Sequence, residues 1–544
     1  MAANNRPHEG LISDRSILSR RVNRFLDDAD QKIYDTFVPQ DDMGSLIDRV
    51  NVEITLNEEL NNPEDVQELT DYVVEKKANK VFLLLIYSDA VKYIRDLQRA
   101  DFTDEDLPVI TRESKDGSGV SVHRWRVNDN SAYADEQRLA GFERWSESKL
   151  EDFFEKQWIF LAPVFAQDKF THVLYSRSPL PYMRTQGSDM SSGEGHFGTI
   201  RKRGLHNGHH EYQGLFKVIP STTSLQGNPF TSFNQNEETG RHIPVAVKTL
   251  NTQGSAVTDV EKFFTKESDT LEKMKTLNHP HLIKAVATYR KGVDRCFVFP
   301  WAQEGSLRDF WRNHSASLDE NLVSWTIDQM VGLSDGLKQL HKGHTRHGDL
   351  KPDNILCFVS GNERTLVLAD VGLAKYHPAY TRDRSKATTT RHGSRIYEPP
   401  EMSANRGNIV VSRKYDIWSL GCVFLEFTIW LLYGRSGLAL FRSTLLNNPD
   451  IDRFWQYDTD NNPQIHQVAR NWLDKMTRDL QGASALRDLV LLIAKQLLVP
   501  GLEERADAER VYFELETIQR DSSSDSQYLF NPELEELATR RDGT

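Results

Sequence analysis

Residues 347–356 read His-Gly-Asp-Leu-Lys-Pro-Asp-Asn-Ile-Leu, and residues 370–372 read Asp-Val-Gly. The first stretch places the carboxylate of Asp349 two residues before the ammonium group of Lys351. A positioned carboxylate can accept the proton of an attacking hydroxyl, and a nearby lysine can contact a phosphate. These stretches therefore predict a site at which a phosphoryl group passes to a hydroxyl.

Two further residues of the same stretches offer oxygen ligands for a metal ion. Asn354 and Asp370 are sixteen residues apart. Amide and carboxylate oxygens are the hard ligands that Mg²⁺ prefers, and the ion neutralises charge on phosphoryl oxygens. The alternative interpretation is a polar loop that connects a helix to a strand by chance. Such a loop would not require these four residues in this order and at this spacing.

A glycine-rich segment lies upstream, at residues 193–200. Its predicted nucleotide-contacting residues are Gly193, Glu194, Gly195, Gly198 and Ile200. Glycines let the backbone approach a polyphosphate closely and present N–H groups to it. An ordinary glycine turn is the alternative reading of this segment taken alone.

A lysine follows on an apolar run, Pro-Val-Ala-Val-Lys at residues 244–248. The run predicts a strand that directs Lys248 inward, with Ala246 on the same strand. A buried lysine is costly unless an acid pairs with it. Glu267 is the preferred partner because Leu271 and Met274 follow it at helical spacing; Glu261 and Glu272 remain alternatives.

Together these motifs resemble, in their order, a eukaryotic-type protein kinase over about residues 186–520. The resemblance implies an α+β fold of two lobes, the smaller rich in β-strands and the larger helical. It implies ATP and Mg²⁺ as cofactors and protein hydroxyls as acceptors. A narrower resemblance, to filamentous-fungal kinases with a helical N-terminal region, is carried by phrases such as Gln-Trp-Ile-Phe-Leu-Ala-Pro at residues 157–163.

The resemblance implies further site residues. Residues 297–302 align with the strand and hinge that hold adenine, so Phe299 would line the back of the pocket. The carbonyl of Pro300 would accept from the adenine amino group and the N–H of Ala302 would donate. Leu356 is implied as a nucleotide contact.

Scaffold residues are implied as well. Glu401 would pair with Arg505 in a buried ion pair, and Asp416 would bond the backbone of the catalytic loop. The pair Lys351-Pro352 and Ser394 match the serine/threonine rather than the tyrosine pattern.

Two positions depart from the family pattern. Gly348 stands where many members carry an arginine that receives an activation-loop phosphate, so activity is expected not to need that contact. Val371 stands where family members usually carry a phenylalanine. This smaller side chain reduces an apolar contact to the helix that carries Glu267.

Composition restricts the function classes. The chain has 544 residues and a net charge of −12, which disfavours general nucleic-acid or anionic-membrane binding. Three cysteines are too few for a disulfide framework and suggest a reducing compartment. No apolar run reaches the roughly 20 residues of a membrane span. The expected location is the cytoplasm, with the nucleus as a further possibility.

Three domains are predicted: a mostly helical accessory region at residues 1–180, the kinase domain at 186–520 with a polar surface insertion at about 202–242, and a flexible tail at 521–544. Within the insertion, His206, His209 and His210 are interpreted as solvated loop residues rather than metal ligands. In the accessory region, Trp125, Trp145 and Trp158 are read as core anchors rather than a binding groove.

The predicted function is phosphorylation of protein serine or threonine hydroxyls in intracellular signalling. A scaffold that binds nucleotide or protein partners without turnover is the alternative. A third hypothesis assigns the function to residues 1–180 as a structural adaptor. Protein substrates, and a protein partner of the N-terminal region, are the expected partners; no nucleic acid is expected.

Overall fold

The computed structural model describes residues 37–60, 65–113, 120–127, 132–183, 191–195, 198–211, 242–250, 257–315, 317–371, 395–404, 412–447 and 453–542. The chain divides into two compact units. Unit 1 comprises residues 1–213, 237–253 and 286–298, and unit 2 comprises residues 214–236, 254–285 and 299–544.

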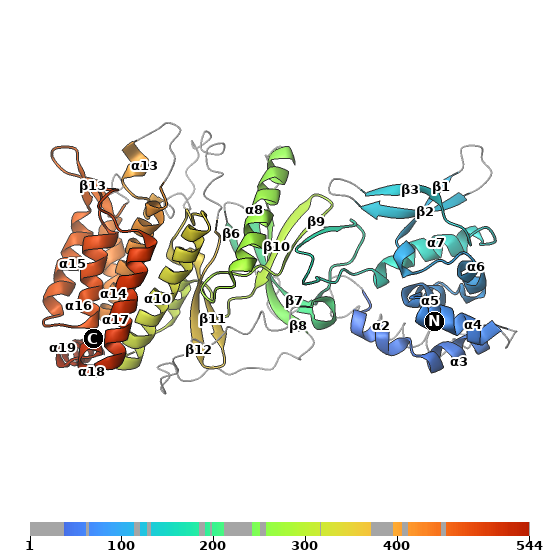
Figure 1. Ribbon diagram of the computed structural model, residues 1–544, viewed down its shortest axis with the longest axis horizontal. Helices are drawn as coiled ribbons and strands as arrows, with labels where there is room; N and C mark the ends of the chain where they lie inside the picture. The colour runs from blue at the N-terminus through green and yellow to red at the C-terminus, as the bar shows by residue number, and fades with distance from the viewer. Residues whose placement is uncertain are drawn as a thin grey trace, which may run out of the picture. The chain divides into compact units, whose positions relative to one another are not determined.

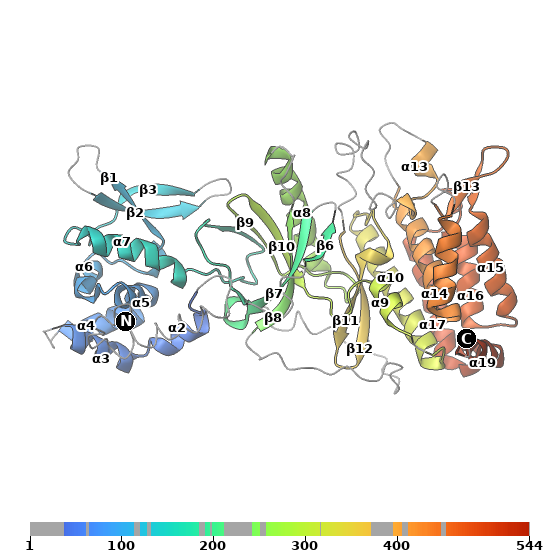
Figure 2. The same cartoon turned by 180° about the vertical axis from the view of Figure 1, so that it is seen from behind.

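The first part of unit 1 is a helical cluster around one apolar helix, α5 (Figure 2). Every residue from Val81 to Ile86 of α5 is buried, so this helix is a core element on all its sides. Asp48 caps the neighbouring α3 by accepting from the N–H of Asn51. The helices are α2 Gln40–Leu46, α3 Arg49–Glu59, α4 Val66–Glu75, α5 Asn79–Tyr87, η2 Val91–Tyr93, α6 Ile94–Arg99, η3 Asp104–Asp106, α7 Glu147–Lys156 and η4 Gln157–Phe160.

This region also contains a three-stranded antiparallel sheet that the helical prediction missed: β1 Val109–Glu113, β2 Val120–Val127 and β3 Ala132–Arg138. The tryptophans are packing residues. Trp145 stacks on Tyr93 at 4.5 Å between ring centroids, and Trp125 contacts the buried Trp158 edge to face at 5.6 Å. The prediction that they anchor cores is confirmed for Trp145 and Trp158, which are buried, whereas Trp125 is half-buried.

The second part of unit 1 is built on a seven-stranded sheet of order β4-β9-β10-β8-β7-β5, with β6 paired to β7. Its strands are β4 Thr171–Leu174, β5 Tyr182–Met183, β6 Ser191–Gly195, β7 Gly198–His206, β8 His242–Leu250, β9 Ala287–Lys291 and β10 Asp294–Pro300. Both β4 and β5 precede residue 186, so the sheet extends beyond the predicted start of the kinase domain.

The predicted insertion begins later than expected. Strand β7 continues to His206 and is followed by the 3-10 helix η5, Asn207–His209, while residues 212–241 lie outside the described part of the chain. His206 and His209 are buried rather than solvated. The polar composition around residue 205 was misleading because β7 is paired along its length with β8.

Unit 2 is mainly helical, and its longest helices are α14 with 32 residues, α10 with 23 and α8 with 21; α15, α16 and α17 pack with α10 and α14 (Figure 1). Its helices are α8 Val257–Leu277, α9 Leu307–Asn313, α10 Glu320–Lys342, η6 Pro352–Asn354, α13 Glu401–Ala404, α14 Lys414–Leu445, α15 Gln467–Asp479, α16 Ala485–Leu492, η9 Ile493–Leu497, α17 Ala508–Ser524, α18 Ser526–Leu529 and α19 Pro532–Asp542. Two hairpins complete it: β11 Ile355–Ser360 with β12 Glu363–Leu368, and β13 Trp455–Tyr457 with β14 Pro463–Ile465.

The central helix of unit 2, α14, is long and apolar enough to cross a membrane by length and composition alone. However, 89% of its most apolar window is buried inside the protein, as in a core helix. Its helical path is interrupted at Gly434, which has φ 66°.

The end of the chain is helical, so the prediction of a flexible tail at residues 521–544 is wrong for the described residues up to 542. Asp525 caps α18 by accepting from the N–H groups of Gln527 and Tyr528. Leu529 and Leu534 are buried. Residues 521–526 are rich in serine, but Asp525 is a helix cap and the leucines that follow it are core residues.

Candidate active site

The loop that carries Asp349 connects α10 to the short helix η6, which begins at Pro352. Proline suits this first helical position because its missing N–H would have no helical partner there. Lys351 Nζ donates to Asp349 Oδ2 at 2.7 Å, and Asn354 Nδ2 donates to the same oxygen at 3.1 Å and to the Asp349 carbonyl at 2.8 Å. The structure therefore brings together the three predicted residues of this loop.

A buried carboxylate on α14 holds the backbone of the loop. Asp416 accepts from the N–H of His347 at 2.9 Å, from the N–H of Gly348 at 2.8 Å and from His341 Nε2 at 2.9 Å. Gly348 has φ 80°, a conformation that favours glycine. The prediction that Asp416 bonds this backbone is confirmed.

Asp370 lies at the end of β12, beside the loop. The N–H of Ala369 donates to the carbonyl of Asn354 at 2.9 Å, and Asp370 adopts φ 57° directly after it. Burial lowers the pKa of His347, while the nearby carboxylates of Asp416, Asp349 and Asp370 act in the opposite direction. The hydrogen bond from Ala369 to Asn354 thus places the backbone of Asp370 beside the loop of Asp349.

A second charged network reaches this loop, and the sequence analysis did not find it. Arg308 on α9 donates to both carboxylate oxygens of Asp353, at 2.7 and 2.6 Å. Tyr397 donates to Glu426 at 2.8 Å, and Arg442 binds both oxygens of Glu426. Arg308 also donates to the Tyr397 hydroxyl at 3.3 Å, which joins the two halves.

No sequence pattern signalled this network. Arg308 and Asp353 are 45 residues apart, and neither stands at a spacing that points to the other. Burial alone would raise the pKa of Asp353, but the hydrogen bonds from Arg308 outweigh it and lower that pKa. The network keeps Asp353, the neighbour of Asn354, ionised and fixed.

The predicted hinge residues lie at the end of β10 and in the turn after it. Pro300 and Ala302 are buried and Phe299 is half-buried. The turn is tied to β11, because the N–H of Cys357 donates to the Gly305 carbonyl at 2.8 Å and Ser306 bridges to Leu356. Leu356 therefore lies beside the segment that follows Ala302.

Glu304 belongs to the same turn, and two side chains hold its carboxylate in place. Arg364 on β12 donates to both of its oxygens, at 2.8 and 3.0 Å, and His314 Nε2 lies 3.4 Å away. Burial raises the pKa of Glu304, but the hydrogen bonds from His314 and Arg364 outweigh it and lower the pKa to about 2.

In unit 1, the glycine-rich segment forms the hairpin of β6 and β7. Gly195 pairs with Gly198, Glu194 with Thr199, and Gly193 with Ile200. A side chain at Gly198 is excluded because its Cβ would lie 2.0 Å from the Thr249 carbonyl oxygen. The backbone thus requires glycine here.

Lys248 is buried on β8, directly opposite Ile200 of β7, and Ala246 pairs with Lys202. The register places the predicted lysine beside the glycine-rich hairpin. Of the three candidate acids on α8, Glu267 is buried, Glu261 is half-buried and Glu272 is exposed. The pairing of Lys248 with one of these acids stays a prediction.

Several predicted features lie outside the described residues: Gly372, Ser394 and the segment between them. Val371 is fully buried. Glu401 and Arg505 pair as predicted, with Arg505 Nη1 and Nη2 donating to the two carboxylate oxygens at 2.8 and 3.0 Å.

Comparison with known proteins gives one family match. The family described as "Protein kinase domain" matches residues 230–484. This part of the chain is similar to protein kinase domains. The match includes Lys248 and the loop of Asp349 but begins after the glycine-rich hairpin, so the kinase sheet extends upstream of it.

Curated relatives of the kinase domain are similar at low identity. They include the serine/threonine-protein kinase chk-2 of Caenorhabditis elegans, 32% identical over 34% of this chain and 37% of that protein. The Aurora kinase of Schizosaccharomyces pombe is 29% identical over 42% and 64%. The calcium/calmodulin-dependent protein kinase cmkA of Emericella nidulans is 32% identical over 31% and 37%. The chain spans between 10% and 64% of the length of these and similar relatives.

Proposed function

We propose that the chain is an active serine/threonine protein kinase that transfers the γ-phosphoryl group of ATP to protein hydroxyls, in intracellular signalling. The observation that carries this proposal is the arrangement around Asp349, whose carboxylate accepts from Lys351 and Asn354 at 2.7 and 3.1 Å. The buried Asp416 fixes the backbone on which this carboxylate stands.

In the proposed reaction, Asp349 orients the acceptor hydroxyl and accepts its proton as the oxygen attacks the γ-phosphorus and ADP leaves. Lys351, already beside that carboxylate, would contact the transferred phosphoryl group. Lys248, next to the glycine-rich hairpin, would hold the phosphates of ATP, and Glu267 would orient Lys248. Phe299, Pro300, Ala302 and Leu356 would contact the adenine.

The residues fit a Mg²⁺ ion. The amide nitrogen of Asn354 is committed to Asp349, so its amide oxygen is the atom available to ligate a metal. Asp370, placed after Ala369, supplies a carboxylate. When bound, the ion would neutralise charge on the phosphoryl oxygens. Hard oxygen donors of this kind suit magnesium better than a softer metal.

The preference for serine and threonine rests on Lys351-Pro352 and on relatives whose names state that specificity. Lys351 and Asp349 bond each other at the position where the acceptor would enter. A short hydroxyl side chain would reach this pair, whereas a tyrosine would hold its hydroxyl farther from its own backbone.

The decisive variant is Asp349→Ala. It removes the group that orients the nucleophile and leaves the predicted phosphate contacts, so phosphorylation of a generic acceptor should fall by several orders of magnitude while ATP binding persists. Transfer of radiolabelled phosphate, with and without Mg²⁺, would measure the first effect, and a fluorescent nucleotide the second. Asp474→Ala, on the exposed side of α15, is the matched control.

If Asp349→Ala were as active as the parent chain, the assignment of Asp349 would be wrong. If the parent chain bound ATP but showed no transfer to any acceptor, the scaffold hypothesis would replace the proposed activity.

A further inference from the structure

Within unit 1, the accessory helices contact the kinase sheet at one end of β7. Helix α2 begins at Gln40 and meets the turn η5, which follows β7. Gln40 N donates to the ring nitrogen Nε2 of His209 at 3.1 Å. Phe37, also buried, contacts the His209 ring edge to face at 5.0 Å and the His206 ring at 6.1 Å. We call Phe37, Gln40, Asp41, His206 and His209 the α2 seat.

Both nitrogens of the His209 ring are used in this seat. Nε2 accepts from Gln40, so Nδ1 carries the proton and donates to the carbonyl of Pro163 at 3.0 Å. His209 is fully buried, and this burial lowers its pKa to about 4. The ring is therefore a neutral link among three stretches of chain: α2, residue 163 and the end of β7.

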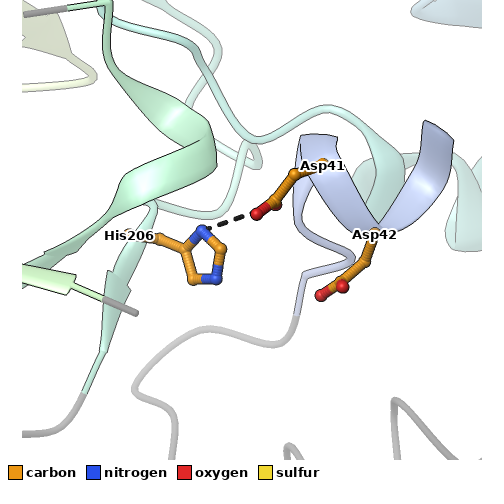
Figure 3. Close-up of side chains that lie close together, drawn as sticks. All are labelled: Asp41, Asp42 and His206. Carbon is orange, nitrogen blue, oxygen red and sulfur yellow. Dashed lines mark ion pairs between the residues drawn. The ribbon is translucent and has the colours of Figure 1, made fainter. Parts of the chain in front are cut away.

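Asp41 completes the seat on the same side. Figure 3 shows its carboxylate directed toward the His206 ring, with Oδ1 3.8 Å from Nδ1. The His206 Nδ1 atom also accepts from the N–H of Gly208 at 3.1 Å. A Cβ at Gly208 would lie 2.2 Å from the Asp41 carboxylate, so glycine lets helix and turn approach.

Ligand atoms of Asp41, Asp42 and His206 lie within 4.8 Å of one another, which raises the question of a metal ion. Their other interactions account for the grouping. The two carboxylates stand in the first turn of α2, where the helix dipole stabilises negative charge, and the His206 Nδ1 atom already accepts a hydrogen bond. These three side chains therefore belong to the contact between α2 and η5 rather than to a metal site.

The α2 seat lies at the end of β7 that is opposite to the glycine-rich hairpin. Strand β7 runs without interruption from Gly198 to His206 and pairs residue for residue with β8. At about 3.3 Å per residue, roughly 26 Å separate its two ends. Because a register shift would move Ile200 away from Lys248, fixing the His206 end also fixes the position of the lysine relative to the hairpin.

We propose that Gln40 and His209 are positioning residues for ATP binding: by seating α2 on the end of β7, the accessory region sets the geometry of the glycine-rich hairpin and Lys248. This inference rests on the proposed kinase function. It gives residues 37–160 a role within the same chain, as a support of the nucleotide-binding sheet, rather than only as a surface for a separate partner.

Gln40→Pro tests the contact with little other change. Proline removes the donating N–H, is tolerated in the first helical turn, and follows Pro39, whose φ −61° and ψ 146° suit a residue before proline. Gln40→Ala is the matched control, because it keeps the N–H and removes an exposed side chain. Asp41→Ala, also at an exposed residue, is a second control, because the His206 Nδ1 atom that the Asp41 carboxylate faces already accepts from Gly208 and has no proton to share.

The dissociation constant of ATP, measured with a fluorescent nucleotide, should rise about two- to twelvefold in Gln40→Pro, the range given by loss of one hydrogen bond. It should change less than twofold in Gln40→Ala. Amide hydrogen exchange should become faster along β7 only in Gln40→Pro.

Two outcomes would overturn the inference. In the first, Gln40→Pro and Gln40→Ala bind ATP equally well. In the second, Gln40→Pro lowers the melting temperature but leaves the ATP affinity unchanged, which would show that the contact is purely structural. A parent chain that bound no ATP would instead refute the proposed kinase function, so the two failures are distinguishable.

Discussion

Replacing Asp416 by asparagine should loosen the catalytic loop without changing the size of the side chain. In the native structure, Oδ1 accepts from the N–H of Gly348, and Oδ2 accepts from the N–H of His347 and from His341. Asparagine has one acceptor oxygen in place of two. In either orientation, its NH₂ group must therefore face a buried backbone N–H that has lost its acceptor.

The magnitude follows from these contacts. A hydrogen bond to a charged group contributes about 1.5–3 kcal/mol, and a buried N–H left without an acceptor costs about 1–3 kcal/mol. The two terms overlap because they describe the same N–H group. Asp416→Asn should therefore lower the free energy of unfolding by about 2–4 kcal/mol. Because the loop also carries Asp349, kcat should fall about ten- to a hundredfold, as expected for a misplaced catalytic group.

Chemical denaturation followed by circular dichroism would measure the stability, and phosphate transfer at saturating ATP would measure kcat. Asp474→Asn makes the same chemical change at an exposed position of α15 and should be silent in both assays. A variant at Asp416 with the parent's denaturation midpoint and turnover would refute the view that this carboxylate holds the loop.

Two further expectations concern the same unit. Gly348→Ala should lower the free energy of unfolding by about 1–2 kcal/mol, since φ 80° is unfavourable for any residue with a Cβ, and an unchanged denaturation midpoint would contradict this. The pKa of Glu304 is lowered from 4.5 to about 2, so its contribution to stability is complete above pH 4.5 and is lost as the pH falls toward 2. Glu304→Gln should flatten this part of the stability–pH curve, and a variant whose curve matched that of the parent would show that Glu304 is not responsible.

The loop of Asp349 could be predicted from sequence because its residues contact one another over short chain distances. Asp349, Lys351 and Asn354 lie within six residues, and each contact that joins them is local. The contacts of Asp416 and the pair of Glu401 with Arg505 were predicted at long range only through the family resemblance, and both are confirmed.

Contacts that no local sequence motif signals were not predicted. The pairing of Arg308 with Asp353 depends on the placement of α9 against the loop, which no local pattern encodes. Composition misled at two places. The stretch around His206 is polar but is a paired strand, and the serine-rich stretch near residue 525 is polar but contains a helix cap. At the first place strand pairing, and at the second a helix cap, determined the local structure more strongly than the polar residue types did.

The order of the kinase sheet has a practical consequence for shortened versions of the chain. Its two outer strands, β4 and β5, both come from residues before 186, where the similarity to kinases was expected to begin. A fragment starting there would leave β9 and the Gly204–Leu205 part of β7 with open backbone donors and acceptors. Such open edges recruit strands from other molecules, so the truncated chain would be prone to aggregate, and a stable fragment has to begin upstream of Thr171.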